Sequence, residues 1–243
     1  MKVEKVILNR VEGEVSLKIQ WDSYGKVSDA FVVAYNSRGF EKILEGKELP
    51  DALVITPRIC GICGHAHLIA TVNAIENLYM ANSINIDVPQ KAKLIRQITL
   101  YSEIIQNHLK WFYLFIMPDF IKLLPTAYLE DFRPFSGEKW KKAIKYSSEI
   151  VKIIAIFGGQ WPHTSYAIAG GVTADPLKTD IIEALSIVDN LIKYVEKEIL
   201  GIQYEEYLEI KNIEEYLAKS ENGDLKKFID LCIKSNLDTT GQS

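Results

Sequence analysis

The chain has 243 residues, of which 48% are hydrophobic, so it is long enough to bury a substantial core. Its 28 basic and 32 acidic residues give a net charge of -4 and no basic patch, which argues against a nucleic-acid-binding protein. Three cysteines, two of them in one motif, argue against a disulfide framework. Residues 1–5 show no apolar signal segment, and the longest apolar stretch, about residues 111–117, is too short to span a bilayer.

The N-terminal region predicts a β-hairpin. Apolar and polar residues alternate over 15–21, turn-forming residues follow at 22–26, and a second run of strand formers covers 27–35. We expect one face of this hairpin to be buried, the face that carries Val15, Leu17, Ile19 and Trp21.

The rest of the chain predicts helices, at roughly 66–81, 90–116, 137–157, 177–200 and a pair after 211. The longest carries a nearly continuous apolar stripe, which points to the core of a bundle: Leu94, Ile98, Tyr101, Ile105, Leu109, Phe112 and Ile116. We therefore expect an α+β fold, mostly α, in which an N-terminal β-hairpin packs on a helical bundle. We treat residues 1–243 as a single domain.

The most informative motif is RICGICGHAH over residues 58–67, which places Cys60 and Cys63 where a loop turns into a helix. The N–H groups at a helix start are unpaired and the helix dipole is positive there, so both favour thiolate over thiol. Gly61 and Gly64 allow the tight bend that brings both sulfurs to one centre. The motif thus indicates a site for a soft metal, in a loop buried against the end of the bundle.

The residues alone leave three other interpretations of the cysteine pair open. The cysteines could be buried packing residues, a redox dithiol, or half of a structural zinc site that also uses His65 and His67. The third cysteine, Cys232, lies in an apolar helical stripe and is expected to be a core residue.

Several segments, in the same order along the chain, resemble one family. They are RVEG at residues 10–13, RGFE at 38–41, the cysteine motif at 58–67, and FGGQWPH at 157–163 followed by GGVT at 170–173. This set resembles the large subunit of nickel-iron hydrogenases, and the match covers about residues 9–175. The resemblance implies reversible, heterolytic cleavage of H2 to protons and electrons.

The resemblance also implies roles at the metals. Cys60 would be a terminal ligand of nickel, and Cys63 would bridge nickel and an iron that carries diatomic ligands. His67 and Arg58 would lie beside these ligands and tune them through hydrogen bonds. On its own, His67 would be taken for a helix-cap histidine.

Two carboxylates gain roles from the same resemblance. Glu12 would be the first proton acceptor beyond the sulfur, and Glu41 would bind a nearby magnesium ion, a hard cation that prefers oxygen ligands. Without the resemblance, Glu12 would be a loop carboxylate and Glu41 a surface charge.

The sequence departs from the family pattern in two places. The second cysteine pair, a C-terminal Asp-Pro-Cys-x-x-Cys segment, does not occur, so the chain supplies two of four thiolates. It is therefore interpreted as an incomplete, N-terminal part of a large subunit, whose other half is in the same or a separate chain. In a helical segment, Asn107 and Trp111 stand where Asp and His are common, while His108 keeps its place.

The partners follow from what the chain lacks. No cysteines are left to bind iron-sulfur clusters, so the resemblance implies a small subunit that carries them. Such a protein would act in the cytoplasm or at a membrane through its partners, or be exported on the partner's signal. Two alternatives are a hydrogen-sensing relative and a non-catalytic relative such as the quinone-pocket subunit of complex I, which lacks the cysteine pair.

Overall fold

The computed structural model describes residues 2–8, 13–124 and 127–240, in two compact units, residues 1–47 and 48–243. The first unit holds an antiparallel sheet in the order β1-β2-β3, formed by β1 (Lys2–Leu8), β2 (Val15–Trp21) and β3 (Val27–Ala34), and a short helix α1 (Phe40–Leu44). The predicted hairpin is β2 and β3, and β1 extends it to three strands. The assignment of residues 1–243 to one domain stays a prediction.

Within this unit the expected inward face of the hairpin is only partly covered. The predicted inward residues of β2 are only half-buried, whereas Ser16 on the opposite face is fully buried. Ser16 tolerates burial because its hydroxyl is hydrogen-bonded to the Tyr35 hydroxyl at 2.9 Å.

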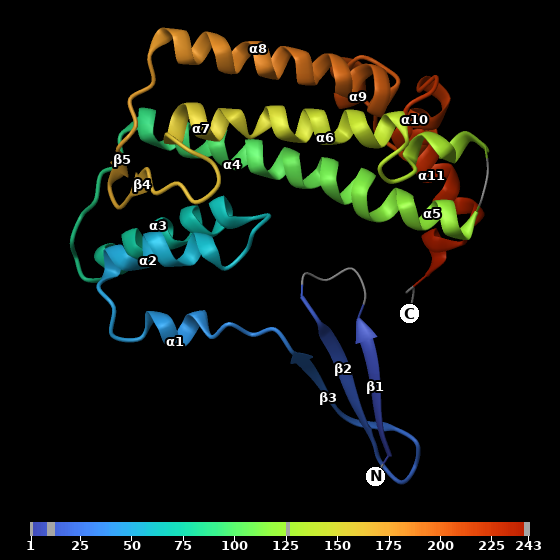
Figure 1. Ribbon diagram of the computed structural model, residues 1–243, viewed down its shortest axis with the longest axis horizontal. Coiled ribbons are helices and arrows are strands. Elements are labelled where there is room, and N and C mark those ends of the chain that lie inside the picture. The colour runs from blue at the N-terminus through green and yellow to red at the C-terminus, as the bar shows by residue number, and fades with distance from the viewer. Residues whose placement is uncertain (1, 9–12, 125–126, 241–243) are drawn as a thin grey trace. The chain divides into compact units, whose positions relative to one another are not determined.

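The second unit is a stack of helices (Figure 1), in which α4 contacts α3, α6 and α7, and α8 contacts α6 and α7. A two-stranded sheet, β4 (Ala167–Ile168) and β5 (Gly171–Val172), lies against α3 and α4. The helices are α2 (Leu49–Ile55), α3 (Gly64–Ala81), α4 (Gln90–Lys110), α5 (Met117–Leu123), α6 (Glu138–Ile150), α7 (Lys152–Gly158), α8 (Lys178–Tyr194), α9 (Tyr204–Leu208), α10 (Ile213–Lys219) and α11 (Asp224–Lys234). The predicted helices correspond to α3, α4, α6 with α7, α8, and the pair α10 and α11, whereas α2, α5 and α9 were not predicted. The fold class, α+β and mostly α, is confirmed.

Two long helices continue through π-helical turns. One such turn, Trp111–Ile116, carries α4 into α5, and the other, Val195–Leu200, extends α8. Within the described part of the chain, no helix combines the length and the hydropathy that a membrane span needs.

Helix α4 is a core helix, and the stripe predicted to be buried is buried only in its second half, where Leu109 is 4% exposed and Ile105, Phe112 and Ile116 pack against the core. Three residues of that stripe are exposed, Leu94 by 47%, Ile98 by 40% and Tyr101 by 58%. Besides Ala92, Ile95 and Leu109, the buried face carries several polar side chains, which are Arg96, Thr99, Ser102, Glu103 and Gln106. We call these residues the polar face of α4, and the candidate site is built against it.

Candidate metal centre

The cysteine motif lies between a short turn and a long helix. A 3-10 turn (Thr56–Arg58) follows α2, and α3 begins at Gly64, directly after the two cysteines. A Cβ at Gly64 would clash with the carbonyl oxygen of Pro57, whereas a Cβ at Gly61 would meet nothing within 4 Å. The first turn of α3 therefore packs so closely on the preceding turn that only glycine fits at Gly64.

The two cysteine sulfurs converge on one point. Cys60 and Cys63 are joined as a disulfide, with their Cα atoms 5.4 Å apart, and the Cys63 N–H donates to the Cys60 sulfur at 3.0 Å. Cys60 is 9% exposed. Reduction would leave two soft thiol ligands at the same place, so this donor pair fits one edge of a thiolate-bound nickel or iron site.

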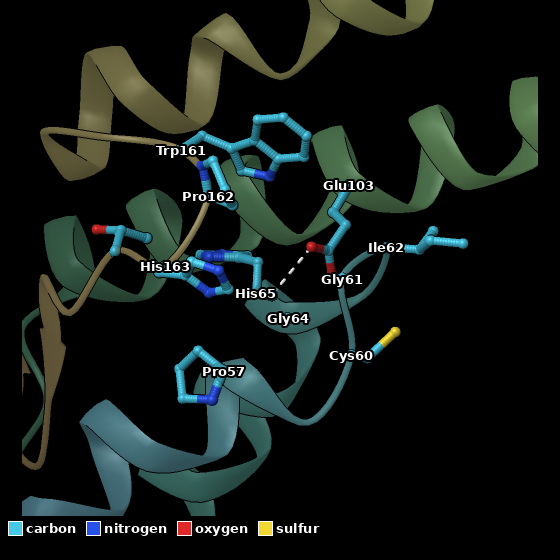
Figure 2. Close-up of a pocket in the computed structure, with 11 residues that line it drawn as sticks. Pro57, Cys60, Gly61, Ile62, Gly64, His65, Glu103, Trp161, Pro162 and His163 are labelled. Carbon is cyan, nitrogen blue, oxygen red and sulfur yellow. Dashed lines mark hydrogen bonds between the residues drawn. The ribbon is translucent and has the colours of Figure 1, made fainter. Parts of the chain in front are cut away.

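A carboxylate from α4 holds the start of α3. Glu103 is 1% exposed, and its two oxygens accept hydrogen bonds from the backbone N–H groups of His65 at 2.9 Å and Ala66 at 2.7 Å. Figure 2 shows Glu103 reaching from its helix to the cysteine loop, while the Cys60 sulfur points away from the Pro57 and His65 rings. Burial raises the pKa of Glu103, against the opposing effect of the two N–H groups.

A small pocket of about 10 Å³ lies beside the cysteine loop, with room for about one water molecule. His65 is buried against it, and burial lowers the pKa of this histidine to about 4. Its ring stacks on Tyr166 with centroids 5.7 Å apart, and its Nδ1 atom has no hydrogen-bond partner among the described residues. The pocket lining is Pro57, Cys60, Gly61, Ile62, Gly64, His65, Glu103, Trp161, Pro162, His163 and Thr164.

The segment that carries Trp161 and Pro162 is tied back to the polar face of α4. The Arg96 guanidinium donates to the carbonyl oxygens of Ile168 at 2.7 Å and Gly171 at 2.8 Å, on β4 and β5. The Thr99 hydroxyl meets the Tyr166 hydroxyl at 2.5 Å. One helix face therefore fixes both the cysteine loop and the loop opposite it.

The residues expected beside the metal ligands lie around α3. Arg58 is exposed, and its guanidinium donates to the carbonyl oxygen of Val54. His67 is half-buried in the first turn of α3, and its backbone N–H donates to the Cys63 carbonyl oxygen at 3.3 Å. Both residues are near the cysteines in sequence, and their roles stay predictions.

The described structure does not test the roles predicted for the two carboxylates. Glu12 lies outside the described residues. Glu41 is exposed in the first turn of α1, in the first unit, whereas the cysteines belong to the second. Cys232 is half-buried on α11 and packs against the core, as its apolar stripe predicted.

Within residues 2–8, 13–124 and 127–240, no group of three or more His, Cys, Asp or Glu side chains is arranged to hold a metal ion. That this chain supplies one pair of sulfurs to a larger site stays a prediction. Sequence reasoning missed Glu103 as a neighbour of that pair, and it named His65 only as a possible zinc ligand. In the sequence, Glu103 stands out only as a carboxylate in the middle of a long helix whose inner face was expected to be apolar.

Comparison with protein families gives a match to the family described as nickel-dependent hydrogenase, over residues 38–131. The chain is 29% identical, over 213 residues, to a component of the vhc F420-non-reducing hydrogenase of Methanococcus voltae, with 85% of this chain and 44% of the relative covered. It is 26% identical to the periplasmic [NiFeSe] hydrogenase large subunit of Desulfomicrobium baculatum, with 81% of this chain and 41% of the relative covered.

A solved structure agrees with these relatives. The chain matches the Ni-Fe-Se hydrogenase of D. vulgaris Hildenborough, in its reduced state, with a TM-score of 0.63 and 26% identity, over 81% of this chain and 43% of that chain. The chain thus spans less than half the length of the relatives named here. Family model, relatives and solved structure point the same way, and the chain belongs to the nickel-dependent hydrogenase family, in which it matches the large subunits.

Proposed function

We propose that the chain is part of the catalytic large subunit of a nickel-iron hydrogenase, which cleaves H2 reversibly and heterolytically to protons and electrons. The observation that carries the proposal is the convergence of the Cys60 and Cys63 sulfurs at the start of α3, in a chain of a nickel-dependent family.

In this proposal Cys60 and Cys63 are two of the thiolates that hold a nickel-iron centre, whose iron carries diatomic ligands. Two further thiolates come from sequence outside these 243 residues, in the same or a separate chain. When bound, the centre supplies Lewis-acid chemistry that polarises H2. A cysteine sulfur then holds the released proton, and Glu12 accepts it from that sulfur.

The surroundings of the cysteine pair support such chemistry. Apolar groups of Ile62, Trp161 and Pro162 line the adjoining pocket, which has room for about one water molecule. A site that excludes bulk water strengthens the electrostatic interactions within it. His67 and Arg58, close to the pair in sequence, would tune the ligands, and Glu41 would hold a magnesium ion.

The electrons need a carrier that this chain does not provide. Its remaining cysteine, Cys232, packs against the core on α11. We propose a small subunit with iron-sulfur clusters as the partner. A relative's description as a large subunit supports this arrangement.

The proposal is tested by hydrogen uptake in the assembled protein, purified without oxygen and assayed with an artificial electron acceptor. Cys60→Ser and Cys63→Ser should each abolish uptake, because a hard hydroxyl replaces a soft thiolate. Cys232→Ser is the matched control and should retain uptake. Uptake at the wild-type rate in either motif variant, or no uptake by the wild-type assembly, would contradict the proposal.

A second test uses the chain alone. With two of four thiolates, the isolated 243-residue chain should neither hold stoichiometric nickel nor consume hydrogen. Stoichiometric nickel together with hydrogen uptake in the anaerobically purified chain would show that the half-site interpretation is wrong.

A further inference from the structure

The start of α3 depends on a side chain from another helix. A helix leaves its first N–H groups without intrahelical partners, and a side chain of the N-cap residue usually accepts from one of them. Here the N-cap residue is Cys63, whose side chain makes no capping hydrogen bond. The acceptors come instead from Glu103, which lies 38 residues after His65 in the sequence.

The link between Glu103 and the cysteine pair is short and rigid. Cys63 directly precedes the helix, so the two N–H groups that bind Glu103 lie two and three residues after a proposed metal ligand. Glu103 is itself fixed because it is buried on the central helix α4. The bonds to a charged acceptor are of the stronger kind, and both oxygens are used.

The opposite side of the loop is fixed as well. The start of α3 packs against the Pro57 carbonyl so closely that Gly64 has no room for a Cβ. A loop with one fixed side could still rotate about it, whereas Glu103 holds the other side through two backbone groups. The backbone that directly follows Cys63 is therefore held from two directions, by Pro57 and by Glu103.

We propose that Glu103 is a positioning residue, which holds the cysteine loop against α4 so that the Cys60 and Cys63 sulfurs stay aligned for metal. Outer hydrogen-bonding partners of this kind are commonly worth roughly 10- to 100-fold in metal affinity. The expected loss of metal rests on the proposed function. The expected change in backbone amide exchange rests on the structure alone.

The backbone readout is hydrogen-deuterium exchange at single amides of the assembled protein, reduced and kept without oxygen. Glu103→Ala should speed exchange at both His65 and Ala66 by about tenfold or more, because both lose their acceptor. Glu103→Gln keeps one acceptor oxygen, so only one of these two amides should speed up.

The metal readout is nickel per chain, together with the nickel-thiolate charge-transfer absorption. Both should fall in Glu103→Ala and less so in Glu103→Gln. Asp224→Asn is the matched control, because this buried carboxylate accepts from Tyr113 at 2.7 Å and lies on α11. It should lower stability without changing exchange at His65 and Ala66 or the thiolate absorption.

Unchanged exchange at both amides in Glu103→Ala would overturn the proposal, as would faster exchange with normal nickel content and absorption. Nickel loss in Asp224→Asn equal to that in Glu103→Ala would also overturn it, because the effect would then be one of general stability. A failure of the hydrogenase assignment would look different. Cys60→Ser and Cys63→Ser would then keep normal nickel, while Glu103→Ala would still speed amide exchange at His65 and Ala66.

Discussion

Breaking the buried ion pair between α3 and α4 should strongly destabilise the second unit, because one charge is then left buried without its partner. Arg96 donates to Glu76 at 2.8 and 3.2 Å, and the Gly170 N–H donates to the same carboxylate at 2.9 Å. Both partners of the pair are buried. Arg96→Ala leaves a buried carboxylate without its counter-charge and two carbonyl oxygens without their donor, which costs about 3–5 kcal/mol at pH 7.

The assay is urea unfolding of the assembled protein. With a denaturant slope of about 3 kcal/mol per molar, that loss lowers the urea midpoint by roughly 1 to 1.7 M. The control is Lys91→Ala, which breaks an ion pair with Asp175 whose side chains are 61% and 85% exposed. An exposed pair should cost about 1 kcal/mol or less.

The loss should also depend on pH. Burial raises the pKa of Glu76, but the hydrogen bonds from Arg96 and the Gly170 N–H outweigh it and lower that pKa below its ordinary value of 4.5. Such a carboxyl stabilises the fold above the unfolded pKa, and this stability is lost as the pH falls through the folded pKa. The gap between wild type and Arg96→Ala should therefore shrink at low pH. A loss at pH 7 no greater than that of Lys91→Ala, or a gap that widens in acid, would refute the reasoning.

Three further predictions address the site and its support. Gly64→Ala should destabilise the chain by about 1–3 kcal/mol in thermal unfolding, because its Cβ would clash with the Pro57 carbonyl, while Gly61→Ala should be tolerated; equal effects would contradict the close approach. Tyr113→Phe removes the hydrogen bond to Asp224 and should cost about 1.5–3 kcal/mol, whereas the exposed Tyr101→Phe should cost almost nothing in the same unfolding assay. Glu12→Gln should leave nickel content intact and slow hydrogen-deuterium exchange with H2 by about 10²-fold, and a near-normal rate would return Glu12 to an ordinary loop carboxylate.

Local patterns predicted the elements of this chain well, because helices and strands are set by short-range spacing. The cysteine loop at a helix start, the long helices and the hairpin all appear near their expected bounds. Cys60 and Cys63 were likewise recognisable, because the motif lies in one short stretch of sequence.

The residues that support the site could not be found in this way. Apolar spacing selected Leu94 and Ile98 for the inner face of α4, yet those side chains are exposed, and much of the buried face is polar. A polar inner face is stable only because each group meets a partner from elsewhere, as Glu103 meets α3 and Arg96 meets Glu76. Those partners are set by tertiary packing, which a single sequence does not display.

The central claim is that Cys60 and Cys63 bind nickel, and X-ray absorption at the nickel edge tests it most directly. The assembled wild-type protein, purified without oxygen, should contain about one nickel per chain with sulfur as its dominant neighbour. Cys60→Ser and Cys63→Ser should each lose the metal, whereas Cys232→Ser should keep the wild-type spectrum. A wild-type spectrum dominated by nitrogen and oxygen, or full nickel with unchanged sulfur neighbours in either motif variant, would contradict the account.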